Sequence, residues 1–362
     1  MARCLLTEDY DKTKYEIETP LTSKVDYVQV RRELGVPDYV DPENFLLERG
    51  LVTIWAAQKP SRLREIDSSP ELGRIKDDPI PVLFLGGGAV KLLSKTANDL
   101  RSPLHRIIND IDLVSSKKRG KDLYRLLLIM GEICGSRYYH FVTQTDRRFN
   151  AMRSGDRYRV RAIDNVADSN SVKAGTLDIL IDNIDMRHKL DVKNALDDPR
   201  QQHYTIGLEN VLLSKCQYIF DTPKTAYEEL AQHRLEYRIL DYPYYKSDRL
   251  LIGIEEKDLK DICSILLDHK VGNGADELNL NTLNSVLGKD KKFTLTFRLN
   301  FQNILRNENM LKDLGLKNDS VETIMSRANE VLSAVPTVDK KWSHPWWNVD
   351  VQTPTIYGKT PN

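Results

Sequence analysis

Two sets of residues in this chain have types and spacings that could do chemistry: a run of glycines and three aspartates. Gly86, Gly87 and Gly88 stand between the apolar segments 82–85 and 89–93. The first segment has the pattern of a buried strand and the second that of the first turns of a helix. Glycines at such a turn let the backbone approach a ligand closely, and the start of the helix favours anions such as phosphate.

The aspartates stand in two further apolar segments. Asp110 and Asp112 are two residues apart in segment 107–114, and Asp178 lies in segment 176–181. On a strand, residues two apart point to the same face, so Asp110 and Asp112 should project together. Acids on buried strands need a partner, because an unpaired charge away from water is costly. We therefore expect the three carboxylates to share a cation, and oxygen ligands suit magnesium completed by nucleotide phosphates.

Each feature alone has a common structural explanation. A glycine triplet is usually only a turn, and an Asp-x-Asp pair often lies in a loop or at a sheet edge. The order of strand, glycines, helix, acid pair and third acid favours a metal site over these explanations.

Further residues extend the pattern. Arg106 stands four residues before Asp110, Lys215 follows an apolar helical stretch, and residues 257–261 have the sequence Lys-Asp-Leu-Lys-Asp. Together with the glycine turn and the Asp-Ile-Asp pair, this order resembles the nucleotidyltransferase superfamily of DNA polymerase β type. Within it, the chain is similar to the AbiEii branch, which is named for the toxin of bacterial abortive-infection and toxin–antitoxin pairs.

The resemblance implies a magnesium-dependent enzyme that transfers a nucleotidyl group from a nucleoside triphosphate, such as ATP, to an acceptor hydroxyl. Mg²⁺, or Mn²⁺ in its place, would be held by Asp110, Asp112 and Asp178. The glycine run and Arg106 would bind the triphosphate. The implied acceptor is RNA such as a tRNA 3′ end, and a toxin would have an antitoxin protein as partner. The alternative is an inactive nucleotide-binding or interaction module that kept the fold.

Two residues in the second half of the chain have open alternatives. Lys215 lies in an apolar helical stripe, where a lysine must reach the helix edge or meet an anion. The resemblance favours contact with a nucleotide phosphate. Asp258 and Asp261 stand one turn apart on the next helical pattern, which fits a solvated, ion-paired face. By resemblance, Asp258 is instead a catalytic residue, either as general base on the acceptor hydroxyl or as a partner that orients Lys215.

Arginines are dense between Asp146 and Arg161, where Phe149 and Tyr158 are interleaved. If this stretch forms a pair of strands, its arginines could bind triphosphate or an RNA backbone. A solvated hairpin explains the same pattern equally well, because acids nearby dilute the charge.

Composition bounds the class of protein. The chain has 362 residues, 40% of them hydrophobic, and its 53 basic and 53 acidic side chains cancel. Such a length predicts two or three domains, and the zero net charge excludes global attraction to nucleic acid. The four cysteines lack metal-type spacing, and we expect Cys216 and Cys263 to be buried free thiols. With neither a signal peptide nor a membrane-spanning run, we expect a cytoplasmic protein without a membrane partner.

The pattern along the chain predicts an α+β protein: a nucleotidyltransferase-fold mixed sheet flanked by helices, followed by a mainly helical C-terminal domain. We expect an N-terminal extension at 1–78, the catalytic core at 79–200, the helical domain at 201–336 and an irregular tryptophan-containing tail at 337–362. Helices are predicted at 42–58 and 122–134 and, in the helical domain, at about 207–220, 224–238, 255–269, 294–314 and 319–334.

Overall fold

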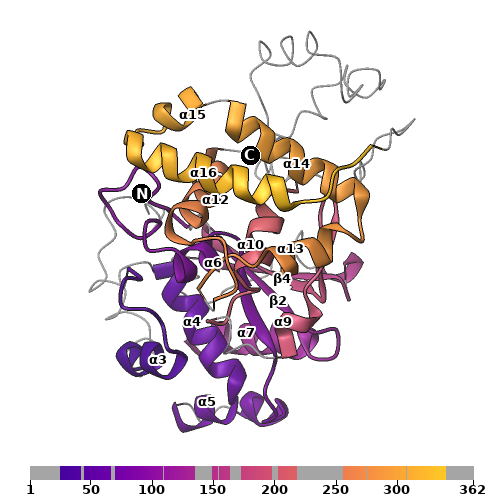
Figure 1. The fold of residues 1–362 in the computed structure, drawn as a ribbon. Helices are drawn as coiled ribbons and strands as arrows, with labels where there is room; N and C mark the ends of the chain where they lie inside the picture. The colour runs from indigo at the N-terminus through magenta and orange to yellow at the C-terminus, as the bar shows by residue number, and fades with distance from the viewer. Residues whose placement is uncertain are drawn as a thin grey trace. The chain divides into compact units, whose positions relative to one another are not determined.

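The computed structural model describes residues 25–41, 45–66, 70–108, 110–134, 149–153, 155–163, 173–197, 203–217, 256–274, 276–306 and 308–339. The chain divides into two compact units. Unit 1 comprises residues 1–100, 106–184 and 191–211, and unit 2 comprises residues 101–105, 185–190 and 212–362. Figure 1 labels the helices and strands of both units.

Unit 1 is built on a mixed four-stranded sheet with the order β1-β2-β4-β3. Its strands are β1 (Val82–Leu85), β2 (Asp110–Ser115), β3 (Arg157–Ile163) and β4 (Lys173–Ile181). β2 and β4 are parallel, whereas β1 pairs antiparallel with β2 and β3 pairs antiparallel with β4. The α+β class and the mixed sheet are thus confirmed, and β3 adds a strand within the region predicted as an arginine-rich hairpin.

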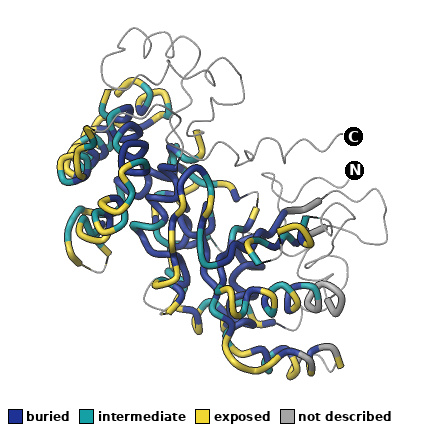
Figure 2. Tube along the Cα trace, turned by 90° about the vertical axis from the view of Figure 1, so that its right-hand side faces the viewer, coloured by how far each residue is buried: buried dark blue, intermediate teal, exposed yellow. Residues whose placement is uncertain are grey.

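One face of this sheet is apolar and covered by two helices. A row of residues across the four strands consists of Phe84, Leu113, Ile179 and Tyr158, all buried. The helices α4 (Phe45–Gln58) and α7 (Gly120–Cys134) pack on this face, where Tyr124 of α7 stacks on Tyr158 at 5.0 Å. Figure 2 shows how burial varies along the chain, and β1 is buried at all four of its residues. The opposite face is therefore the one on which the aspartates stand.

Shorter elements complete unit 1. They are α3 (Tyr27–Leu34), α5 (Ser61–Ile66), the 3₁₀ helix η1 (Pro70–Arg74), α6 (Gly86–Leu93) and α9 (Lys193–Asp197). The sequence did not predict α3, α5 or η1, because these segments are short and rich in polar residues. The loop at 204–206 runs beside β1, where the Phe84 N–H donates to the Tyr204 carbonyl at 2.6 Å and the Ile206 N–H donates to the Phe84 carbonyl at 3.0 Å.

Unit 2 is mainly helical over its described residues. It contains α12 (Glu256–Asp268), α13 (Leu280–Leu287), α14 (Lys291–Arg306), α15 (Glu308–Asp313) and α16 (Asn318–Ala334). α12 and α16 confirm two predicted helices, whereas the helix predicted at 294–314 is two helices, α14 and α15. The sequence missed α13. The helix predicted at 224–238 lies outside the described residues, as does nearly all of the tail.

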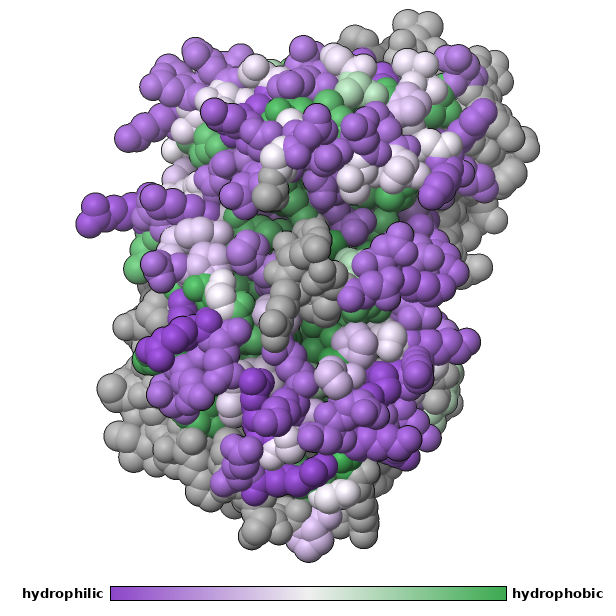
Figure 3. All heavy atoms as spheres, turned by 60° about the horizontal axis from the view of Figure 1, so that its bottom comes forward, coloured by the Kyte–Doolittle hydropathy of each residue, from purple (hydrophilic) through white to green (hydrophobic). Residues whose placement is uncertain are grey.

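The remaining elements lie where the chain passes from one unit to the other. They are α10 (Leu208–Lys215) and the two-stranded sheet of β5 (Asn183–Asp185) and β6 (Lys189–Asp191). In the part of the chain that the structure describes, no helix has the length and apolar character required to cross a bilayer. Hydrophilic side chains dominate the face drawn in Figure 3.

Cys216 and Cys263 are buried free thiols, as predicted. Burial raises the pKa of Cys263 to about 12.

Candidate functional site

The three aspartates lie on one face of the unit 1 sheet, on neighbouring strands. Asp112 of β2 is directly opposite Asp178 of β4, and Asp110 is opposite Thr176. Asp110 is exposed, Asp112 is half-buried and Asp178 is buried. The parallel pairing of β2 with β4 thus brings together carboxylates that are 66 residues apart in the sequence.

The glycine run meets the middle of this carboxylate row. Gly86 begins α6 with a φ of +63°, and a Cβ atom there would lie 2.6 Å from Oδ2 of Asp112. Only glycine adopts this backbone conformation readily and leaves room for the carboxylate. A Cβ at Gly87 would lie 3.3 Å from Nη2 of Arg106. The start of α6, the Asp112 carboxylate and the Arg106 guanidinium are therefore neighbours, and phosphate binding by this turn stays a prediction.

Gly88 has a different environment from the other two glycines. A Cβ there would come within 2.9 Å of the Phe84 ring, so this position faces the apolar core. The three glycines thus serve two purposes: Gly86 and Gly87 make room for polar side chains, and Gly88 makes room for the core.

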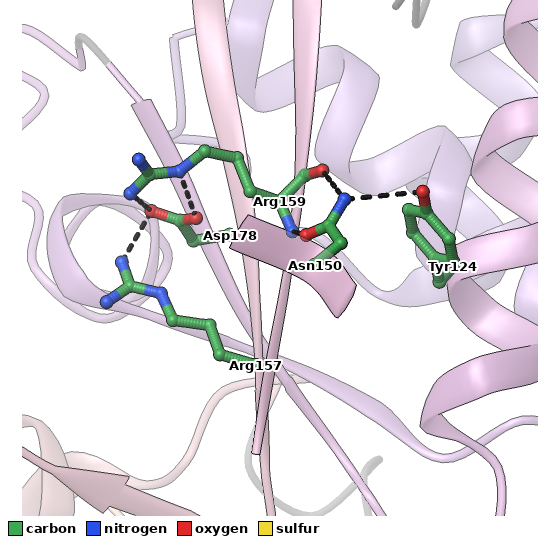
Figure 4. A network of polar contacts seen from close by, with 5 residues as sticks. All are labelled: Tyr124, Asn150, Arg157, Arg159 and Asp178. Carbon is green, nitrogen blue, oxygen red and sulfur yellow. Dashed lines mark hydrogen bonds and ion pairs between the residues drawn. The ribbon is translucent and has the colours of Figure 1, made fainter. Parts of the chain in front are cut away.

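Asp178 is bound by two arginines of the adjacent strand β3 (Figure 4). Arg159 donates from Nε to Oδ1 at 2.8 Å and from Nη2 to Oδ2 at 3.0 Å, and Arg157 donates from Nη2 to Oδ2 at 2.6 Å. The Asp178 side chain is only 7% exposed. Burial opposes its ionisation, but the two guanidinium groups outweigh burial and hold the pKa of Asp178 below its ordinary value. Asp178 is accordingly a carboxylate whose two oxygens both accept hydrogen bonds from arginine.

Asn150 fixes the strand that carries these arginines. Its Oδ1 accepts from the Arg159 N–H at 2.7 Å, and its Nδ2 donates to the Arg159 carbonyl at 2.9 Å. The same Nδ2 reaches the Tyr124 hydroxyl at 3.3 Å. Phe149 lies beside the guanidinium of Arg159, 4.9 Å from ring centroid to Cζ. The sequence pattern had indicated neither role, because a single Asn or Phe before a strand carries no distinctive signal.

Lys91 is another residue that the sequence did not single out. It lies on α6 with a side chain only 1% exposed, and its Nζ is 4.0 Å from Oδ2 of Asp41. Burial lowers the pKa of Lys91, the Asp41 carboxylate opposes that shift, and Arg106 adds to it. A lysine inside the otherwise apolar stretch 89–93 was the available signal.

The residues singled out in the second half of the chain meet one another within unit 2. Nζ of Lys215 lies 2.9 Å from Oδ1 of Asp258 and 2.7 Å from Oδ2 of Asp261. Asp261 is almost fully buried, with 1% of its side chain exposed. The sequence left two alternatives for Lys215, reaching the helix edge or meeting an anion, and the structure shows it beside two carboxylates. Asp258 is in position to orient the ammonium group. Contact of Lys215 with a phosphate stays a prediction.

A divalent cation such as Mg²⁺ needs oxygen ligands grouped around one point. Across the described ranges, no three His, Cys, Asp or Glu side chains lie close enough together to hold a metal ion. The Asp178 carboxylate is bound by its two arginines. Its role as a third metal ligand stays a prediction. Asp110 and Asp112 fit the requirement of Mg²⁺, which is commonly bound by one or two carboxylates, with phosphate oxygens and water completing the shell.

No protein-family model, curated protein or solved structure matches this chain.

Proposed function

We propose that unit 1 is a nucleotidyltransferase domain that uses Mg²⁺ or Mn²⁺ to transfer a nucleotidyl group from a nucleoside triphosphate to an acceptor hydroxyl. The observation that carries the proposal is the juxtaposition of Asp112 with Gly86 at the start of α6, beside Asp178 on the next strand. A cation-binding carboxylate next to an anion-binding helix start is the pair of features that a metal–triphosphate complex requires.

The residues have distinct roles in this proposal. Asp110 and Asp112 would hold the cation, with Asp178 as the third ligand that the resemblance implies. When bound, the cation would supply positive charge that stabilises the α-phosphate during the transfer and the departure of pyrophosphate. The backbone N–H groups at the start of α6 and the Arg106 guanidinium orient the phosphates and neutralise their charge.

Lys215 and Asp258 are assigned to the same reaction by resemblance. Lys215 contacts a phosphate, and Asp258 either orients that lysine, as their 2.9 Å contact favours, or accepts the proton of the acceptor hydroxyl. The proposed acceptor is RNA such as a tRNA 3′ end, and the proposed biological role is the toxin of a toxin–antitoxin pair.

Labelled transfer tests the proposal. The full chain is incubated with each α-³²P nucleoside triphosphate, Mg²⁺ and total RNA, beside Asp110→Ala/Asp112→Ala. Label that enters RNA or the protein itself, and is lost in the variant, identifies the donor and the acceptor class together. Magnesium-dependent triphosphate binding without incorporation of any label would instead support the inactive binding module.

A further inference from the structure

We propose that Arg157 and Arg159 form a phosphate-binding subsite, in which Asp178 occupies the place of a substrate phosphate until that phosphate arrives. The inference rests on the proposed function and deepens it, because it assigns the arginine pair and gives Asp178 a role as their positioning residue.

The hydrogen-bonding geometry of the arginine pair suits a phosphate. Arg159 meets Asp178 through two parallel N–H donors, the arrangement by which guanidinium groups bind both carboxylates and phosphates. Arg157 adds a third contact to the same carboxylate. A phosphate oxygen pair could therefore replace the two oxygens of Asp178 without a change in the type of interaction.

The arginine pair also has donor capacity that Asp178 does not fill. Two guanidinium groups share the single carboxylate of Asp178. The Nε of Arg157 is buried and finds no acceptor among the residues that the structure describes. A buried donor without a partner is costly, and a phosphate, with more acceptor oxygens and more charge than a carboxylate, would satisfy it.

Neighbouring side chains hold the arginine pair in place before any ligand binds. Asn150 holds the backbone of Arg159 through two hydrogen bonds, and Phe149 lies beside both guanidinium groups, at 4.9 Å from Arg159 and 5.9 Å from Arg157. The register across β2, β4 and β3 sets Arg159 in the same row as Asp178 and Asp112. Transfer of the arginines to a phosphate would release the oxygens of Asp178 toward Asp112, where the proposed function needs a third carboxylate.

Phosphate binding in the absence of metal tests this exchange. Tripolyphosphate, a non-hydrolysable triphosphate analogue and a short oligoribonucleotide are titrated separately into the full chain in the presence of EDTA. Arg157→Gln and Arg159→Gln should each weaken binding of the recognised ligand about tenfold or more. Asp178→Asn should tighten it about tenfold, because the competing carboxylate charge is removed while the shape is kept. Arg125→Gln, an exposed arginine of α7, is the matched control and should change binding less than about twofold.

The outcomes separate the two proposals. Tighter binding in Asp178→Asn supports the exchange, and the ligand that responds shows whether the phosphate comes from the nucleotide or from an RNA backbone. Unchanged affinity in both arginine variants would overturn the inference, even if labelled transfer is observed and is lost in Asp110→Ala/Asp112→Ala. Thermal unfolding shows whether each variant is folded. If Asp178→Asn does not fold, phosphate binding by Arg157→Gln, a substitution at a half-exposed position, still tests the inference.

Discussion

Replacing Asn150 by alanine should destabilise unit 1 through the backbone of Arg159. The Asn150 side chain makes hydrogen bonds of 2.7 and 2.9 Å to the N–H and carbonyl of Arg159, and the residue is only 6% exposed. Each such bond contributes about 1 kcal/mol net, and a buried backbone group left without a partner costs about 1–3 kcal/mol. We expect Asn150→Ala to lower the free energy of unfolding by about 2–3 kcal/mol in urea denaturation.

Asn183 provides the control for this experiment. It lies on β5, and its Oδ1 is buried without a hydrogen-bond partner among the described residues. Asn183→Ala therefore removes an amide of the same size whose oxygen makes no such hydrogen bond, and should change stability by less than about 0.5 kcal/mol. Equal losses in the two variants, or a loss below about 0.5 kcal/mol in Asn150→Ala, would refute the view that Asn150 fixes β3.

Three other perturbations have defined outcomes. Gly86→Ala should cost about 1 kcal/mol more in urea denaturation than Gly35→Ala, because both have a φ of +63° but only the first meets a carboxylate; equal costs would argue against the close approach. Burial lowers the pKa of His188 from 6.5 to about 4, so as pH falls the unfolded chain is protonated before the folded one. About 3 kcal/mol of stability should therefore be lost between pH 6.5 and 4. The free energy of unfolding should fall with pH more steeply in the wild type than in His188→Gln over this range. Lys215→Met should lose about 3–5 kcal/mol by leaving Asp261 buried without its cation, and Lys215→Met/Asp261→Asn should regain part of it, as thermal or urea unfolding would show.

The sheet was predictable where local patterns suffice. The strands β1, β2 and β4 are short apolar runs, and the two acids spaced at i and i+2 in β2 identify its polar face. An acid inside the apolar run around Asp178 also indicates that this residue needs a partner. The pattern could not identify that partner, because guanidinium groups and metal ions both satisfy a buried carboxylate.

The contacts that set the site depend on long-range pairing, which a single sequence does not encode locally. Arg159 reaches Asp178 only because β3 pairs with β4 in one register; a shift by one residue would place Tyr158 there instead. Likewise, Asn150 binds a strand nine residues ahead through a turn without a characteristic sequence. Short helices such as α13 were missed because eight residues are too few for their apolar spacing to be distinguished from that of a loop.

The two outer strands of the sheet have a consequence for association between molecules. A strand with unpaired N–H and carbonyl groups can recruit a strand of another chain. In this protein, the outer side of β1 is hydrogen-bonded by the loop at 204–206, and at Arg159 the outer side of β3 is occupied by the Asn150 amide. Each outer strand thus has backbone groups already satisfied at this point, and we expect Asn150, which takes the place of one residue of a fifth strand, to make β3 less open to pairing with a strand of another copy.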